Sequence, residues 1–108
     1  MKIGDIRRLV AAGRYEVSIH AQQERLDDDL DLTDIEQALL TGEILEEYPE
    51  DPRGESCLML GFATGRPVHV VLGWARRQAT RRRTLRVITV YIPQRSKWVD
   101  PRTRGVKS

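Results

Sequence analysis

Two apolar runs between Arg66 and Pro93 dominate the hydrophobic pattern of the chain. They read RPVHVVLGWA and LRVITVYIP, and their β-branched and aromatic residues suit the half-buried surface of a β-strand. The connecting segment, RRQATRRRT, carries five arginines, and arginine is almost never fully buried without a partner. The pattern therefore predicts two long strands joined by an exposed basic turn over residues 76–84, here called the arginine turn.

Apolar residues recur at helical spacing in three segments near the N-terminus. The first predicted helix covers Ile3–Ala12. The second begins after Ser18, a good N-cap residue, and ends among the carboxylates of residues 27–29, which oppose the helix dipole. The third is predicted to begin with a capping box over Thr33–Glu36 and to end at Gly42.

Alternating patterns predict two further strands, over residues 43–48 and 56–63, whereas residues 15–17 are expected to form a short extended link. Segregated helices and strands indicate an α+β fold. We expect N-terminal helices packed on one face of a four-stranded antiparallel sheet. The predicted organisation is a single domain over residues 1–98, followed by a mobile basic tail over residues 99–108.

The net charge of +2 hides a strongly polarised chain. Residues 1–65 carry 6 basic and 15 acidic side chains, whereas residues 66–108 carry 12 basic and 1 acidic side chain. Such asymmetry suggests a polyanionic partner for the basic half. It also fits the alternative that the two halves attract each other within one fold.

Three features of the sequence indicate a cytoplasmic protein with no membrane partner. The single cysteine, Cys57, excludes an internal disulfide and is typical of a reducing compartment. The first residues, MKIGDIRRLV, contain arginines where a signal peptide needs its apolar stretch. No apolar run approaches the length of about 20 residues that a membrane span requires.

A series of short motifs in a fixed order resembles a group of small bacterial domains of unassigned function. The motifs are Ser18-Ile19-His20-Ala21, Glu24-Arg25, Thr33-Asp34-Ile35, Ala38-Leu39, Pro67-Val68-His69-Val70-Val71 and Thr89-Val90-Tyr91. The resemblance covers roughly residues 15–98.

That group resembles, more distantly, the RelE/ParE-type toxins, and the BrnT toxins in particular. The resemblance implies a RelE-like α+β fold in which helices pack on a small antiparallel sheet. Many of these toxins are messenger RNA endonucleases that a partner antitoxin silences. The resemblance therefore implies that the partners are RNA or the ribosome and an antitoxin protein. Fold alone does not fix function. The sequence does not indicate an oligomeric state.

Three side chains are candidates for metal-independent RNA cleavage, which needs a base for the 2′-hydroxyl and an acid for the leaving oxygen. Histidine suits both roles because its unperturbed pKa lies near neutrality, and the chain has two histidines, His20 and His69. Tyr91 is a candidate acid or hydrogen-bond donor. Each has a structural alternative: His20 as a helix-capping or packing residue, His69 as a satisfied buried histidine, and Tyr91 as a packing aromatic.

Cationic side chains are candidates for binding RNA phosphates, which arginine can hold through two parallel hydrogen bonds. The candidates are Arg25, Arg66, Arg81, Arg82, Arg83, Arg86, Arg95 and Lys97. The alternative for the arginine turn is an ordinary solvated loop. Trp74 and Trp98 could stack on bases or could equally be packing residues.

The sequence predicts neither a metal site nor a cofactor. One cysteine and two distant histidines lack the spacing of zinc ligands, and no glycine-rich phosphate loop is present. The leading hypothesis is a toxin-like RNA-binding domain with metal-independent endoribonuclease activity, belonging to a toxin–antitoxin pair. The alternative is a non-enzymatic interaction module whose basic surface docks an acidic protein.

Overall fold

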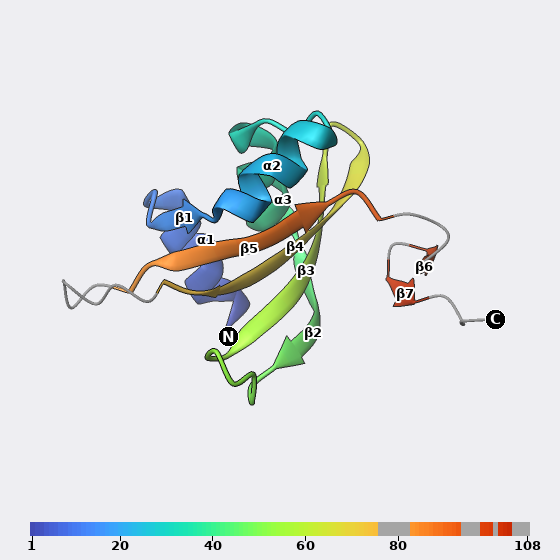
Figure 1. Cartoon of the computed structure of the whole chain (residues 1–108). Helices are drawn as coiled ribbons and strands as arrows, with labels where there is room; N and C mark the ends of the chain where they lie inside the picture. Colours follow the sequence, from blue (N-terminus) through green and yellow to red (C-terminus); the bar gives the residue numbers. More distant parts are fainter. Residues whose placement is uncertain (76–82, 94–97, 101, 105–108) are drawn as a thin grey trace.

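The computed structural model describes residues 1–75, 83–93, 98–100 and 102–104 (Figure 1). Within these residues, helices come mainly before the strands along the chain, and the fold is α+β. The elements are α1 (Ile3–Ala11), β1 (Tyr15–Val17), α2 (Ile19–Asp27), α3 (Leu32–Thr41), β2 (Glu43–Tyr48), β3 (Ser56–Ala63), β4 (Arg66–Trp74), β5 (Leu85–Tyr91), β6 (Trp98–Asp100) and β7 (Thr103–Arg104).

The main sheet has five strands in the order β1-β5-β4-β3-β2. Strands β2 to β5 form the predicted antiparallel meander, but β1 pairs in parallel with β5 at one edge. The prediction of a four-stranded antiparallel sheet is therefore wrong by one strand. The missed strand has only three residues, too few for an alternating pattern to stand out, and Tyr15 and Val17 pack against the core from it.

One face of the sheet forms the core with α1 and α3. Met59, Val70 and Val90 lie side by side in register across β3, β4 and β5, and all three are buried. Ile6 of α1 and Ile35 of α3 pack in the same cluster and are fully buried. The 3.6-residue repeat in the sequence thus identified the helix faces that cover the sheet.

Two glycines allow α3 to lie unusually close to β3. A Cβ at Gly61 would lie 2.0 Å from the carbonyl oxygen of Ala38 in α3, and a Cβ at Gly42, the C-cap of α3, would lie 2.7 Å from the carbonyl oxygen of Leu60 in β3. Both contacts are with backbone, which cannot rotate away. Glycine at these positions therefore sets the distance between the helix layer and the sheet.

Helix α2 lies along the edge of β5 beyond the short strand β1 (Figure 1). The Glu24 carboxylate accepts a hydrogen bond from the backbone N–H of Val90 at 3.1 Å. The Asp28 carboxylate accepts one from the N–H of Ile92 at 3.0 Å. These bonds satisfy donors that an edge strand otherwise leaves open.

The start of α3 lies two residues earlier than the sequence predicted. Its N-cap is Asp31, whose backbone N–H donates to the Asp34 carboxylate at 2.8 Å, so the predicted box from Thr33 is wrong. The Glu36 carboxylate is instead used in a contact with β1, where it accepts a hydrogen bond from the Tyr15 hydroxyl at 2.9 Å. Burial, followed by the hydrogen bond and charge of Glu36, raises the pKa of Tyr15 to about 12.

The opposite face of the sheet is also covered in part. Leu58, Leu60 and His69 point away from the helix side, because their neighbours Met59 and Val70 point toward it, yet each is at most 1% exposed. In the turn between β6 and β7, the Arg102 guanidinium lies 2.6 Å from the Glu43 carboxylate of β2. The sequence pattern predicted no strands after Pro93, and the expected mobility of residues 99–108 stays a prediction.

Candidate functional site

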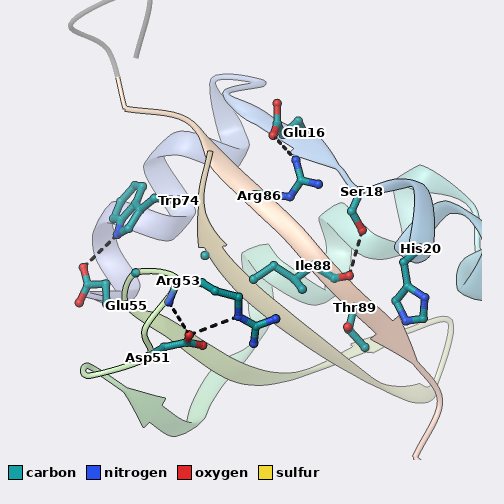
Figure 2. Close-up of a pocket in the computed structure, with 12 residues that line it drawn as sticks. Glu16, Ser18, His20, Asp51, Arg53, Glu55, Trp74, Arg86, Ile88 and Thr89 are labelled. Atoms are coloured by element: carbon teal, nitrogen blue, oxygen red, sulfur yellow. Dashed lines mark hydrogen bonds and ion pairs between the residues drawn. The ribbon is translucent and has the colours of Figure 1, made fainter. Parts of the chain in front are cut away.

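An open cavity of about 820 Å³ lies where β4 and β5 meet the start of α2 and the β2–β3 loop (Figure 2). Its lining combines carboxylates, arginines, one histidine and one tryptophan from segments far apart in the sequence. The lining residues are Glu16, Ser18, His20, Asp51, Arg53, Gly54, Glu55, Gly73, Trp74, Arg86, Ile88 and Thr89.

A bulge in β5 shapes the floor of this cavity. Ile88 and Thr89 are consecutive in the strand, yet both line the cavity. The pairing of β4 with β5 shifts between Val71 and Leu72, which leaves Ile88 as the extra residue, and such bulges re-aim side chains. A Cβ at Gly73 would lie 2.9 Å from the Cδ1 atom of Ile88, so glycine makes room for this side chain on β4.

The start of α2 forms one wall and presents a histidine. The Ser18 hydroxyl accepts a hydrogen bond from the N–H of Ala21 at 3.0 Å and donates to the carbonyl of Ile88 at 2.9 Å, which ties the helix to β5. In the first turn, His20 Nε2 lies 3.2 Å from Glu24 Oε1. The imidazole is 67% exposed, so a carboxylate orients it while a ligand can still reach it.

The β2–β3 loop forms the facing wall. Asp51 accepts hydrogen bonds from the backbone N–H of Arg53 at 2.9 Å, from its Nε at 3.4 Å and from the Ser56 hydroxyl at 3.2 Å. The backbone bond from Arg53, more than any other contact, lowers the pKa of Asp51. The Trp74 indole N–H donates to Glu55 at 2.9 Å, and this bond is the main reason that the pKa of Glu55 is lowered.

The two arginines of the lining are each held by one carboxylate in an ion pair that solvent reaches. Arg86 Nη1 lies 2.8 Å from Glu16 Oε1, and both side chains are 43% exposed, while Arg53 pairs with Asp51. Exposed ion pairs of this kind contribute about 0–1 kcal/mol to stability. A phosphate, which accepts bidentate bonds from arginine, can therefore replace either carboxylate at little cost.

His69 and Tyr91 lie together, but not at this cavity. They are register partners on β4 and β5, with Nδ1 3.3 Å from the tyrosine oxygen and ring centroids 5.3 Å apart. His69 has no exposed surface, so its imidazole does not reach solvent. Its side chain therefore matches the alternative of a satisfied buried histidine, although on the face turned away from the helices.

Two predicted phosphate ligands instead contact the backbone at the C-terminal end of α2. Arg25 donates to the carbonyl of Leu30 at 3.1 Å. Arg66 donates to the carbonyls of Asp28 at 3.4 Å and of Asp29 at 3.3 Å. Asp28 is the C-cap of α2, and Asp29 and Leu30 follow it, so both arginines bind the backbone of the α2–α3 connection. The sequence pattern did not indicate this structural role.

Of the remaining predicted phosphate ligands, one lines the cavity, one lies over Trp74 and four lie outside the described residues. Arg86 lines the cavity. Arg83 lies over the Trp74 ring, with its Cζ atom 3.8 Å from the ring centroid. The residues that lie outside the described part of the chain are Arg81, Arg82, Arg95 and Lys97.

Four charged residues of the lining were not predicted from the sequence as site residues. They are Glu16, Asp51, Arg53 and Glu55. The proline- and glycine-containing sequence of residues 49–54 is typical of a turn, and its composition does not indicate which strand or helix it faces. The sequence indicated Trp74 as a stacking or packing residue, but it did not indicate its contacts with Glu55 and Arg83. The cavity forms where segments distant in sequence meet. Local sequence patterns do not predict such contacts.

Within the described ranges, no group of three or more histidine, cysteine or carboxylate side chains could hold a metal ion. None of the helices in the described part of the chain is long and apolar enough to cross a membrane.

Comparison with known protein families matches residues 17–92 to DUF4258, a domain of unknown function. The chain belongs to the DUF4258 family. The matched region runs from the end of β1 to just past β5, so it includes every lining residue of the cavity except Glu16. No match was found among curated proteins or among solved structures.

Proposed function

We propose that this DUF4258 domain binds RNA at the open cavity and along the adjoining arginine turn, and that it cleaves RNA without a metal as the toxin of a cytoplasmic toxin–antitoxin pair. One observation carries the proposal. His20 and Arg86, predicted separately as a catalytic base and a phosphate ligand, line the same cavity. The distant resemblance to RelE/ParE-type toxins supports the same function.

The lining residues supply both a general base and phosphate ligands for RNA cleavage. His20, oriented by Glu24, takes the proton of a 2′-hydroxyl, and the resulting oxygen attacks the adjacent phosphorus. Arg86 and Arg53 exchange their carboxylate partners for the phosphate oxygens and stabilise their charge. The 5′-oxygen leaves and receives a proton from water or from the protonated histidine. His69 takes no part in this scheme, because it is fully buried.

The test compares three variants with the wild-type domain for binding and cleavage of a labelled single-stranded RNA. We expect Arg86→Gln to weaken binding and to reduce the log-affinity versus log-salt slope by about 0.7, the loss of one phosphate contact. We expect His20→Ala to slow cleavage by about 10²-fold or more, the usual contribution of a general base.

Arg7→Gln is the matched control, because Arg7 lies outside the cavity and donates to the carbonyl of Gly42 at 3.1 Å. It should bind and cleave RNA as the wild type does. Salt-independent affinity in the wild type would contradict the proposal for binding. Unchanged cleavage in a folded His20→Ala variant would contradict the catalytic scheme. Expression of the active domain should arrest growth, and a small antitoxin-like reading frame next to its gene is expected.

A second candidate function is a non-enzymatic module that docks a protein partner. Ile19 is 80% exposed and Leu26 is 62% exposed, and the two lie seven residues apart on the same side of α2. Exposed apolar side chains that share one helix side often mark an interaction surface. A stoichiometric acidic protein that co-purifies without RNA, and is lost on Ile19→Ser with Leu26→Ser, would favour this function over RNA cleavage.

A further inference from the structure

A second, smaller cleft lies at the base of the arginine turn, against α1. Its volume is about 300 Å³, and Trp74 lines both this cleft and the larger cavity. The residues of this cleft are Asp5, Arg8, Leu9, Arg14, Trp74 and Arg83. Arg8 and Arg14 were not among the residues that the sequence indicated as phosphate ligands.

The cleft gathers more positive than negative charge. Arg8 is paired with Asp5, at 3.2 Å, in an exposed ion pair. The Arg14 Nε donates to the carbonyl of Arg83 at 3.2 Å, which fixes the planar guanidinium group, and its terminal nitrogens form no other hydrogen bond within the described part of the chain. Among the described residues, neither Arg14 nor Arg83 pairs with a carboxylate. Three arginines and one carboxylate line the cleft, and the Glu55 carboxylate next to Trp74 also interacts electrostatically with Arg83. The remaining excess of positive charge at the cleft favours the binding of an anion.

Trp74 is fixed in orientation between the two cavities. Its indole N–H is bound by Glu55, and the Arg83 guanidinium lies over its ring at 3.8 Å. The carbonyl of Arg14 accepts a hydrogen bond from the N–H of Leu85 at 3.0 Å, so the backbone of Arg14 is anchored to the start of β5. Both arginines are therefore held in place before a ligand arrives, which is the preorganisation that bidentate anion binding needs.

We propose that this cleft, formed by Arg8, Arg14 and Arg83 beside Trp74, is a second phosphate subsite for single-stranded RNA. The inference rests on the proposed function, since the strand that occupies the large cavity continues past Trp74 into the cleft. A cleft of this size beside an aromatic ring suits one phosphate and its sugar, with a base near the indole. Arg8 would exchange Asp5 for the phosphate in the same way as Arg86 exchanges Glu16.

The subsite lies partly outside the region matched to the family. Asp5, Arg8, Leu9 and Arg14 all precede residue 17, where the match to DUF4258 begins, whereas Trp74 and Arg83 lie inside it. The helix α1 thus adds a phosphate contact to a cavity that the matched region builds almost by itself.

The experiment measures affinity of the full chain for a fluorescently labelled oligouridylate at several salt concentrations. We expect Arg14→Gln to weaken binding about tenfold, the loss of one charge-assisted contact, and to lower the salt slope by about 0.7. Arg14→Lys should restore most of the slope, because it keeps the charge, but less of the affinity, because the planar fork is lost. Arg7→Gln, one residue from Arg8 on α1 but outside the cleft, should behave as wild type.

Tryptophan fluorescence gives a readout that a merely structural role would not change. Wild-type emission should be quenched when RNA binds, and Trp74→Phe should remove that quenching while the variant stays folded. Wild-type affinity and slope in Arg14→Gln, with binding lost in Arg86→Gln, would overturn the subsite and leave the proposed function intact. Absence of RNA binding by the wild type would overturn both. Equal affinity for polyglutamate of matched charge would assign the cleft to an acidic protein and overturn the RNA subsite.

Discussion

At the scale of single residues, the clearest constraint is the lack of a side chain at Gly61. A Cβ there would lie 2.0 Å from the carbonyl oxygen of Ala38 and 2.5 Å from its Cα atom. Neither α3 nor β3 can relieve this contact by rotating a side chain, so the two elements would have to separate. The packing of the core depends on that separation.

We therefore expect Gly61→Ala to destabilise the fold by about 3 kcal/mol, the upper part of the range for overpacked cores. Gly4→Ala is the control, because Gly4 lies exposed in α1 and an added Cβ there would meet nothing within 4 Å. It should be neutral or stabilising by up to about 1 kcal/mol. Urea unfolding followed by circular dichroism measures both, and a Gly61→Ala variant as stable as wild type would contradict the close approach of α3.

A second prediction at this scale concerns Tyr15, whose pKa is raised from 10.0 to about 12 by burial and then by Glu36. A raised pKa in the folded state means that the stabilisation from this group is complete below pH 10 and is lost as the pH rises toward 12. Wild-type stability should thus fall more steeply over that window than the stability of Tyr15→Phe. Parallel curves for the two proteins would rule out the proposed titration.

At the scale of elements, α2 acts as a cover for the edge of β5. Its motif SIHA…ER contributes in three ways: Ser18 ties the helix start to the carbonyl of Ile88, Glu24 accepts from Val90, and Arg25 contacts the carbonyl of Leu30. The same residues that carry the resemblance to the bacterial group therefore have structural roles here. Only His20 of that motif points to the open cavity with an exposed functional group.

We expect Glu24→Ala to cost about 1–3 kcal/mol, because the N–H of Val90 then loses its acceptor at a half-buried edge. Glu24→Gln keeps an oxygen acceptor and should cost less than about 1 kcal/mol. Gln23→Ala, on the exposed side of α2, should change stability by less than about 0.5 kcal/mol. Hydrogen exchange of the Val90 amide should be faster in Glu24→Ala than in the wild type, because the amide has lost its acceptor. Unaltered exchange would contradict the structural role of this hydrogen bond.

The sequence predicts an element well when residues within that element determine it, and poorly when contacts with distant segments determine it. The four long strands and the helix faces follow from periodicities within each segment, and they were predicted. The strand at Tyr15–Val17 exists because β5 offers it an edge, and the cap at Asp31 competes with an equally plausible one at Thr33. The cavity is harder still, because the β2–β3 loop meets α2 and β5 only in the folded chain.

At the scale of the whole molecule, the polarised charge of the sequence is only partly neutralised within the fold. Arg86 with Glu16 and Arg102 with Glu43 join the basic half to the acidic half. Arg83 also interacts electrostatically with Glu55, whose pKa it helps to lower. The fold thus shows attraction between the two halves, and a polyanionic partner for the basic half stays a prediction.

A prediction at this scale concerns the sheet face turned away from the helices. Leu58, Leu60 and His69 are buried there, and the β6–β7 hairpin is joined to β2 of the same sheet through Arg102 and Glu43. Ending the chain after Pro93 should expose both leucines and lower stability by about 3 kcal/mol or more. It should also expose the His69 imidazole to solvent.

The control for this truncation is Arg102→Gln, which removes only an exposed ion pair and should cost less than about 1 kcal/mol. A truncated chain with wild-type stability would show that the face is closed without the residues after Pro93.

The cover that α2 gives to β5 has a consequence for how the protein behaves at high concentration. An uncovered sheet edge is a template on which another chain can add a strand, which leads to aggregation. At one side, Glu24 and Asp28 already occupy the donors beyond β1. At the other, the outermost strand β2 carries Glu43, Glu46 and Glu47, and a second copy pairing there would bring like charges together. The fold thus discourages its sheet from growing from one molecule into the next.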